Sequence, residues 1–133
     1  MATLLSKSNR IFKDVDFSFG NHPDTGNLLI KTDANAIRQS VINLLTLQKN
    51  NKPFHPEIRS PIYGYLFDNF TILEKVVLEG EIKNYLGYYE PRLKINSVTV
   101  SQSNTNSIEC TIVGSIINLQ EPFSVSILVD RLR

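Results

Sequence analysis

The constraint that most limits the fold is a change of pattern at Pro91. Before this proline, apolar residues recur at helical spacing, and proline itself ends a helix. After it, apolar and polar residues alternate over residues 93–100, 108–117 and 123–129, which is typical of half-buried strands. Short links join these stretches. We therefore predict a single α+β domain over residues 1–133, in which a three-stranded antiparallel meander carries helices on its apolar face.

The first and the last of these strands each carry a further signal. In residues 93–100 the apolar positions change parity near Asn96, which predicts a bulge or bend. The last strand has no lysine and no internal proline, the residues that usually protect a free sheet edge. We expect a docking edge there, to which another protein can add a strand, formed by Ser124, Val125, Ser126, Ile127 and Leu128.

Two short extended stretches near the N-terminus predict a loose hairpin over residues 14–31. Residues 14–19 place Val15, Phe17 and Phe19 on one face, and a run rich in turn-forming residues follows. An extended stretch then resumes at residues 28–31. The alternative to a free edge at the end of the chain is that this N-terminal strand pairs with it.

Three helices are predicted between the hairpin and Pro91. A helix over residues 34–47 follows two good N-cap residues, and a short helix over residues 61–67 begins with a Ser-Pro pair. A long helix from residue 71 to about residue 88 begins with the capping box of Thr71 and Glu74. The prediction is therefore a helical middle section between two regions of strands.

The first helix has one apolar stripe, whereas the apolar residues of the third helix change faces. The stripe of the first helix consists of Ile37, Val41, Leu44 and Leu45. Its polar side carries Asn35, Arg38, Gln39 and Asn43. On the third helix, Leu73, Val76, Val77 and Gly80 lie almost opposite Leu78, Ile82, Tyr85 and Tyr89. We expect other elements of the domain to cover both faces; the alternative is that the early face waits for a partner protein.

Composition argues against several classes of protein. The net charge is +1 and no basic stripe is visible, so we expect no nucleic-acid partner. The chain has no apolar run long enough for a signal peptide or a membrane span, so we expect it to act on the cytosolic side or in an assembly built there. Its one cysteine, Cys110, lies in an apolar alternation and is interpreted as a buried structural thiol.

Residues suited to catalysis are sparse. His22 and His55 lie far apart without other ligands at metal spacing, so we expect no metal and no cofactor. Glycoside hydrolysis needs two suitably placed carboxyl groups, one of them desolvated. Glu79 and Glu81 point to different sides of the helix, and Arg92 lowers the pKa of nearby Glu90, the wrong direction for a general acid. We therefore expect no enzyme, with a peptidoglycan glycosidase as the remaining alternative of that class.

The third helix ends on an acid, a proline and an arginine: Glu90, Pro91 and Arg92. Glu90 can hold the guanidinium of Arg92 in a fixed plane, and Arg92 can interact with the carbonyl end of the helix. Two interpretations follow: an internal salt bridge between helix and sheet, or a group that binds a partner's carboxylate. The residues alone favour the internal bridge.

The order of these segments resembles the gene-25-like baseplate wedge family of contractile phage tails, which has similar counterparts in type VI secretion baseplates. The resemblance covers about residues 12–130, and its most specific pieces are the segments 53–57, PFHPE, and 90–92, EPR. The family usually has a glycine soon after the first segment, whereas this chain has Ile58 and Arg59 before Ser60.

The resemblance implies a structural role rather than catalysis. The chain would clamp the helical core bundle of larger wedge proteins, and the expected partner-binding residues are Pro53, Phe54, Pro56, Glu57, Glu90, Pro91 and Arg92. On this interpretation Arg92 serves the partner more than the fold, so its replacement by alanine should barely change stability. The edge of the final strand would bind the tail sheath protein.

The resemblance also implies a place. The protein would be part of the virion, in the tail baseplate, after assembly in the host cytoplasm; it would be a monomer in isolation and repeat with six-fold symmetry in the assembly. The alternative of a different class is a soluble anti-adaptor of a stress response with the same fold, which would use these surfaces against one soluble partner.

Overall fold

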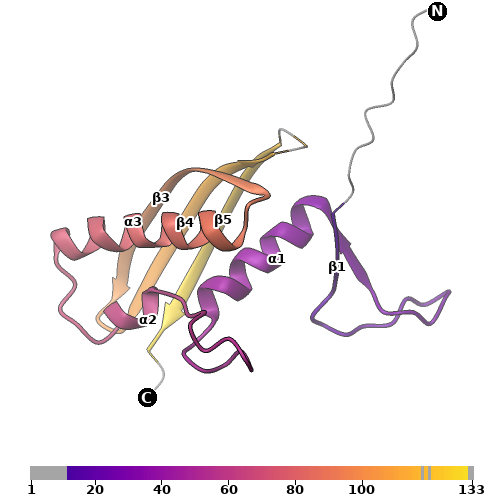
Figure 1. The fold of residues 1–133 in the computed structure, drawn as a ribbon, viewed down its shortest axis with the longest axis horizontal. Coiled ribbons are helices and arrows are strands. Elements are labelled where there is room, and N and C mark those ends of the chain that lie inside the picture. Colours follow the sequence, from indigo (N-terminus) through magenta and orange to yellow (C-terminus); the bar gives the residue numbers. More distant parts are fainter. Residues whose placement is uncertain (1–11, 118, 120, 132–133) are drawn as a thin grey trace, which may run out of the picture.

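The computed structural model describes residues 12–117, 119 and 121–131. Within them, a three-stranded antiparallel sheet carries helices on one face. A separate two-stranded hairpin projects from one end of the molecule, where α1 begins (Figure 1). The predicted α+β architecture is confirmed.

The main sheet consists of β3 (Leu93–Asn104), β4 (Ser107–Ile116) and β5 (Pro122–Asp130), in the order β3-β4-β5. Its register shifts between Ile95 and Ser97, where the sequence predicts a bulge. Gly114 lies opposite the shift, and a Cβ atom there would come within 2.3 Å of the Lys94 carbonyl oxygen. The bulge therefore requires a glycine on the neighbouring strand.

The buried face of the sheet follows the predicted alternation. Cys110 is fully buried in β4, and burial raises the pKa of its thiol to about 12, with Glu79 contributing. The predicted buried structural thiol is confirmed. In β5 the residues that face the helices are Phe123, Val125, Ile127 and Val129.

Helix α1 (Asp33–Thr46) lies within a residue of its predicted bounds at each end, and its apolar stripe enters the core. Gln39 was expected on the polar side, but it is buried, with 7% of its surface exposed. Its amide donates through Nε2 to the Val15 carbonyl at 2.8 Å and accepts from the Phe17 amide at 3.4 Å. Gln39 thus attaches the hairpin to α1.

Helix α2 (Ile62–Tyr65) is short, and α3 (Ile72–Tyr89) begins with the predicted capping box of Thr71 and Glu74. The later face of α3 is buried, but the early face is not covered by the described residues. Leu73 is 74% exposed, Val76 59% and Val77 46%. The expectation that the domain covers both faces is wrong, and the alternative of an exposed early face is what the structure shows.

The hairpin consists of β1 (Lys13–Val15) and β2 (Ile30–Thr32), which pair antiparallel. The strand predicted over residues 14–19 is too long, because the chain turns after Val15 and Phe19 adopts a left-handed φ of 50°. Nor does β1 pair with β5: among the described residues, β5 is the last strand of its sheet.

Candidate functional site

The Glu90-Pro91-Arg92 segment joins the end of α3 to the start of β3. The Glu90 amide still donates to the Leu86 carbonyl at 2.8 Å, the last bond of the helix. Proline at the next position cannot continue the helix, and the Leu93 amide bonds back to the Glu90 carbonyl at 3.2 Å. The helix therefore turns into the sheet within these three residues.

The Glu90 carboxylate is at the centre of a buried polar cluster. It is 2% exposed and accepts from Arg92 Nε at 2.5 Å, from Arg92 Nη2 at 2.7 Å and from Ser40 Oγ at 2.6 Å. Burial by itself raises the pKa of Glu90, but the hydrogen bonds from Arg92 and Ser40 outweigh it and leave the pKa lowered. The carboxylate is thus held ionised, and it joins α1 to the turn between α3 and β3.

Arg92 combines this internal role with an accessible surface. Its side chain is 32% exposed, and its guanidinium lies over the Phe12 ring at 5.4 Å from the centroid. Its carbonyl accepts from the Ile117 amide at 3.0 Å, beside β4. The pair with Glu90 is therefore an internal salt bridge, as the residues alone favoured. The expectation that Arg92→Ala leaves stability nearly unchanged is inconsistent with this geometry.

The loop that carries the 53–57 segment presents its side chains to solvent. Phe54 is 96% exposed and has a left-handed φ of 68°, a conformation that is rare and costly for a bulky residue. Pro53 and Pro56 are also exposed. Glu57 pairs with His55 Nδ1 at 3.0 Å, and its pKa is lowered by a backbone hydrogen bond and by His55.

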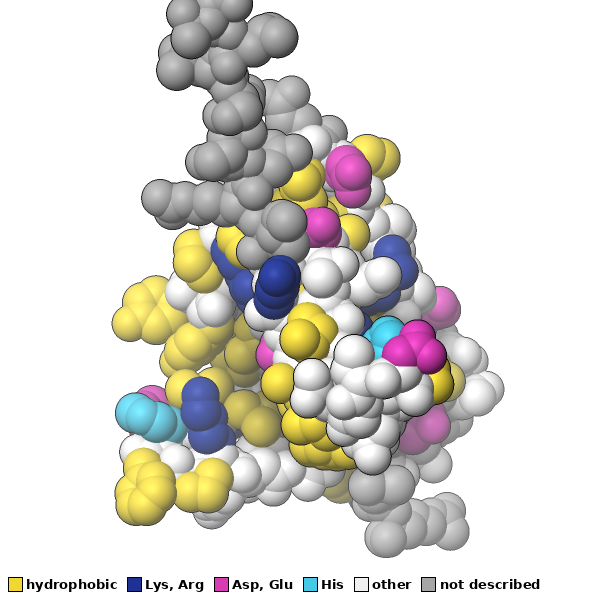
Figure 2. All heavy atoms as spheres, turned by 90° about the vertical axis from the view of Figure 1, so that its right-hand side faces the viewer, with side chains coloured by type: hydrophobic (Ala, Val, Ile, Leu, Met, Phe, Trp, Pro, Cys, Tyr) yellow, Lys and Arg dark blue, Asp and Glu magenta, His cyan; other side chains and the backbone are white. Residues whose placement is uncertain are grey.

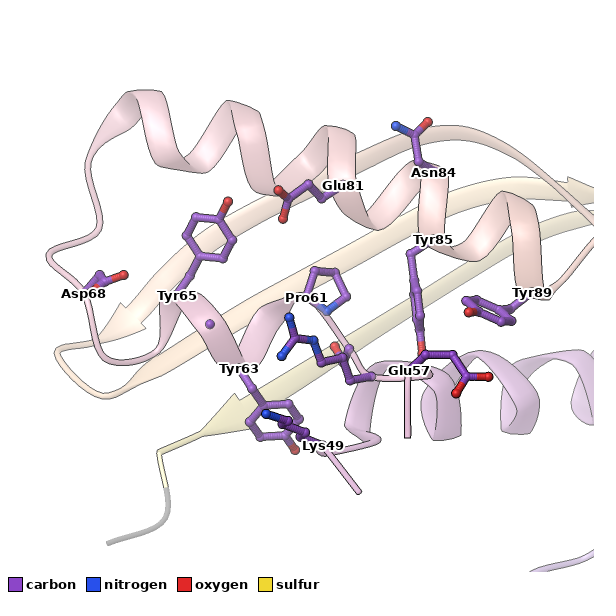
Figure 3. Close-up of a pocket in the computed structure, with 13 residues that line it drawn as sticks. Lys49, Glu57, Pro61, Tyr63, Tyr65, Asp68, Glu81, Asn84, Tyr85 and Tyr89 are labelled. Carbon is purple, nitrogen blue, oxygen red and sulfur yellow. The ribbon is translucent and has the colours of Figure 1, made fainter. Parts of the chain in front are cut away.

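A groove of about 840 Å³ connects this loop with α3 (Figure 3). At one end Glu57 lies near Tyr85 and Tyr89, and Tyr89 directly precedes Glu90. Tyr85 donates to the Leu44 carbonyl at 3.0 Å, and burial raises its pKa to about 12. The groove thus places Glu57 near the last turn of α3, which leads into the 90–92 segment.

The opposite end of the groove is formed by Tyr65, Asp68 and Glu81. Burial and the nearby Glu81 carboxylate raise the pKa of Tyr65. Sequence reasoning missed this groove, because its walls come from α2, α3 and the loop between α1 and α2. The clustering of tyrosines at residues 63, 65, 85 and 89 is the signal that could have indicated it.

The hydrogen-bond pattern of the sheet shows which backbone groups of β5 face its open edge. The Val100 amide of β3 donates to Glu79 Oε1 at 2.9 Å and so points away from β4. Val100 pairs with Cys110, and backbone groups alternate in direction along an antiparallel strand, so Cys110 directs its groups towards Ile127 of β5. The groups that face the open edge are therefore those of Ser124, Ser126 and Leu128.

The two edges of the sheet differ in protection. The β3 edge is engaged by α3 through the Glu79 bond. At the β5 edge, Arg38 Nη2 donates to the Ser124 carbonyl at 3.4 Å, and no described residue bonds to the outward groups of Ser126 and Leu128. A partner strand would therefore find unpaired backbone groups at β5.

The chemistry of the described residues offers little for catalysis. Glu57 and Glu90 are the two carboxyl groups of the candidate site whose pKa is shifted, and both pKa values are lowered. A general acid needs a raised pKa instead. Within the described ranges, no group of three or more His, Cys, Asp or Glu side chains could hold a metal ion. No helix in those ranges is long and apolar enough to cross a membrane.

Comparison with known proteins tests the resemblance. No family model matches the chain. The baseplate wedge protein gp25 of Enterobacteria phage T4 is 26% identical over 110 residues, which cover 79% of this chain and 81% of that protein. The chain is therefore similar to that wedge protein over most of the length of both. The resemblance inferred from the order of the segments along the sequence is confirmed.

Two solved structures share the fold. One is the baseplate of the anti-feeding prophage, with a TM-score of 0.69 and 18% identity over 84% of this chain and 90% of the matched chain. The other is a candidate tail lysozyme from Geobacter sulfurreducens, with a TM-score of 0.65 and 19% identity over 73% of this chain and 89% of that one. At such identities the likeness concerns the fold alone.

Proposed function

We propose that the chain is a structural component of the baseplate wedge of a contractile tail, located in the virion. The observation that carries this proposal is the homology to the T4 wedge protein over 79% of the chain, with a fold shared with a second baseplate component. The low pKa of Glu57 and Glu90 supports a binding role over catalysis.

The proposed clamp consists of the 53–57 and 90–92 segments, and the tyrosine groove runs from Glu57 to Tyr89, the residue before Glu90. Glu90 fixes the guanidinium plane of Arg92 from within, so the exposed edge of Arg92 is oriented for a carboxylate on a helix of a larger wedge protein. Phe54 provides an apolar anchor, since a fully exposed aromatic ring gains most when a partner covers it. Preorganisation of Arg92 by Glu90 lowers the entropic cost of binding.

The proposed second contact is strand addition at β5 by the tail sheath protein. The backbone groups of Ser126 and Leu128 face outward, whereas α3 engages the other sheet edge through Glu79. Main-chain hydrogen bonds would supply the affinity, and the serine-rich outer face of β5 would stay in solvent.

The wedge role is tested by co-expression with the larger wedge proteins and the sheath protein of the same tail. We expect a stable complex with the wedge proteins, and Phe54→Ser should weaken it by at least about tenfold, the loss of a hot-spot aromatic. Phe67→Ser is the control, because Phe67 is also exposed but belongs to neither clamp segment and packs under Arg131. Formation of a normal complex by Phe54→Ser would contradict the clamp.

The soluble anti-adaptor remains the second candidate, because it would use the same surfaces. It would bind one soluble partner and would need no sheath-binding edge. Recovery of a single regulatory protein, without any affinity for wedge or sheath proteins, would favour it over the baseplate role.

A further inference from the structure

The first half of α3 exposes a cluster of apolar side chains. The residues of this cluster are Ile72 (85% exposed), Leu73 (74%), Val76 (59%) and Val77 (46%). None of them belongs to the buried core, which α3 joins through residues on its opposite side. Apolar side chains gathered in this way are typical of interaction surfaces.

The second half of α3 continues the same exposed side with small and polar residues. At 3.6 residues per turn, Gly80, Asn84 and Gly87 lie nearly in line with Leu73, and all three are exposed. A Cβ atom at either glycine would meet nothing within 4 Å, so the fold of the described residues does not require glycine there. Together with Leu73, Val76 and Val77, these three residues form what is here called the outer α3 face.

The two glycines are unfavourable for the helix that contains them. Glycine inside a helix is destabilising relative to alanine, because it loses more conformational freedom on folding. What glycine offers on an exposed helix is room for another backbone to approach closely. Gly80 and Gly87 therefore suit a second helix packed against the outer α3 face.

The spacing of this face makes it complementary to itself. Leu73 and Gly87 each lie seven residues from Gly80, the repeat that keeps residues on one seam of a helix pair. In an antiparallel pair with a two-fold axis beside Gly80, Leu73 of one copy lies opposite Gly87 of the other. The large residues of each first half then face the small residues of the other second half, as a two-fold interface between identical chains requires.

We propose that two copies of the chain pair through the outer α3 face, with their α3 helices antiparallel and crossing at Gly80. Leu73 of each copy occupies the space beside Asn84 and Gly87 of the other. The pair concerns the free chain and does not depend on the wedge function. It differs from the expectation that the isolated chain is a monomer.

The available surface predicts a weak pair. The four apolar side chains and Tyr88, which is 79% exposed next to Gly87, present roughly 600 Å² per copy. Standard stable interfaces bury about 800 Å² per partner, so this contact belongs to the small, reversible class. We expect a dissociation constant of about 1–100 µM.

Packing also selects the antiparallel orientation. In a parallel pair Leu73 would face Leu73 and Gly87 would face Gly87, which leaves a gap at the second half and loses its contacts. The antiparallel pair sets large against small residues along the whole face. It also places the positive end of each helix dipole beside the negative end of the other.

Sedimentation equilibrium of the purified full chain between about 1 and 500 µM measures the pairing. We expect a monomer–dimer equilibrium that Leu73→Ser/Val76→Ser weakens at least about tenfold, because few central apolar side chains carry most of the binding energy. Figure 2 shows that hydrophobic side chains also gather at the hairpin end of the molecule. Phe17→Ser/Ile30→Ser, at positions 54% and 59% exposed, is therefore the matched control and should pair like the wild type.

Gly80→Gln separates pairing from folding. Since a Cβ atom there meets nothing and glutamine is a better helix former, the thermal midpoint at high dilution should be unchanged or raised. Pairing should be lost, because the two new side chains meet at the axis. Normal pairing by Gly80→Gln, or loss of pairing in the hairpin control alone, would overturn the inference.

Disulfide trapping tests the register. Cys110 is buried with a pKa of about 12, so introduced thiols are the reactive ones. Leu73→Cys mixed with Gly87→Cys should form a disulfide-linked dimer on oxidation. Either variant alone should not, because its two thiols lie roughly 21 Å apart along the helices. Crosslinking of each variant with itself, or a chain that stays monomeric over the whole concentration range, would contradict the proposed pair.

Discussion

At the scale of single residues, the informative position is Glu90. A carboxylate that is 2% exposed would be costly without partners, and it has three hydrogen bonds, two from Arg92 and one from Ser40. These bonds connect α1 with the turn between α3 and β3, so the residue that orients Arg92 towards a partner also stabilises the fold. Loss of assembly in an Arg92 variant therefore has to be separated from loss of stability.

Arg92→Ala should lower the free energy of unfolding by about 2–4 kcal/mol, because it leaves the Glu90 carboxylate buried without its cation. Since Arg92 is partly exposed, water near it keeps this loss below that of a fully buried ion pair. Ser40→Ala should cost about 1 kcal/mol, the value of one hydrogen bond. Urea titrations measure both. Arg131→Ala, which removes a cation over Phe67, is the control and should cost less than about 1 kcal/mol. A cost for Arg92→Ala no larger than this control would contradict the internal bridge.

The lowered pKa of Glu90 also predicts a pH dependence of stability. A carboxyl group whose pKa is lower in the folded state contributes stability above its unfolded pKa of about 4.5, and this contribution is lost as the pH falls through the folded pKa. Wild type should therefore be more stable than Glu90→Gln at about pH 7, and the difference should shrink below about pH 4. Denaturant titrations of both proteins from neutral to acidic pH measure it. A constant difference would show that Glu90 is not the linked group.

At the scale of elements, the sequence predicted what local chemistry determines. The capping box at Thr71, the bulge near Asn96 and the alternation of β5 all appear where expected, because each depends on neighbouring residues. The structure differed from the prediction where contacts with distant parts of the chain decide whether a side chain is buried. Gln39 is buried because the hairpin backbone needs its amide, and α3 leaves Leu73 exposed because no described element reaches it.

The candidate site was predictable only in part for the same reason. The 53–57 and 90–92 segments could be chosen from the sequence, but the groove could not, since its walls are distant along the chain. Whether β5 has a free edge also depended on the unknown position of the N-terminal strand. The structure places that strand in the hairpin, next to α1.

Two proline substitutions in β5 distinguish its two sides. Val125→Pro should destabilise the domain by about 1–3 kcal/mol or more, because it removes an amide that alternation directs to β4. Ser126→Pro removes an outward amide, so it should cost the isolated domain less while preventing sheath binding. Ser126→Ala is the matched control, since it loses the hydroxyl bonded to Glu109 but keeps the amide. Sheath recruitment by pull-down and urea titrations supply the two measurements; normal recruitment by Ser126→Pro would exclude β5 as the docking edge.

At the scale of the whole molecule, the proposed contacts lie on different sides of one small fold. The β5 edge belongs to the sheet, and the clamp lies between α3 and the loop before α2 (Figure 1). A protein that joins several neighbours needs such separated surfaces, because partners on one shared face would exclude one another. This arrangement suits an adaptor held within a symmetric assembly.

The whole-molecule alternative is a cell-wall hydrolase, and the groove is where it would act. Glu57 and Glu81 lie on its walls, but glycosidases keep one carboxyl protonated by a raised pKa, and the pKa of Glu57 is lowered. We expect purified protein to release no soluble fragments from peptidoglycan above a buffer control between about pH 4 and pH 8, the range in which such acids work. Glu57→Gln and Glu81→Gln are measured beside it. Turnover by the wild type that disappears in either variant would replace the structural role with an enzymatic one, whereas background release by all three supports an adaptor.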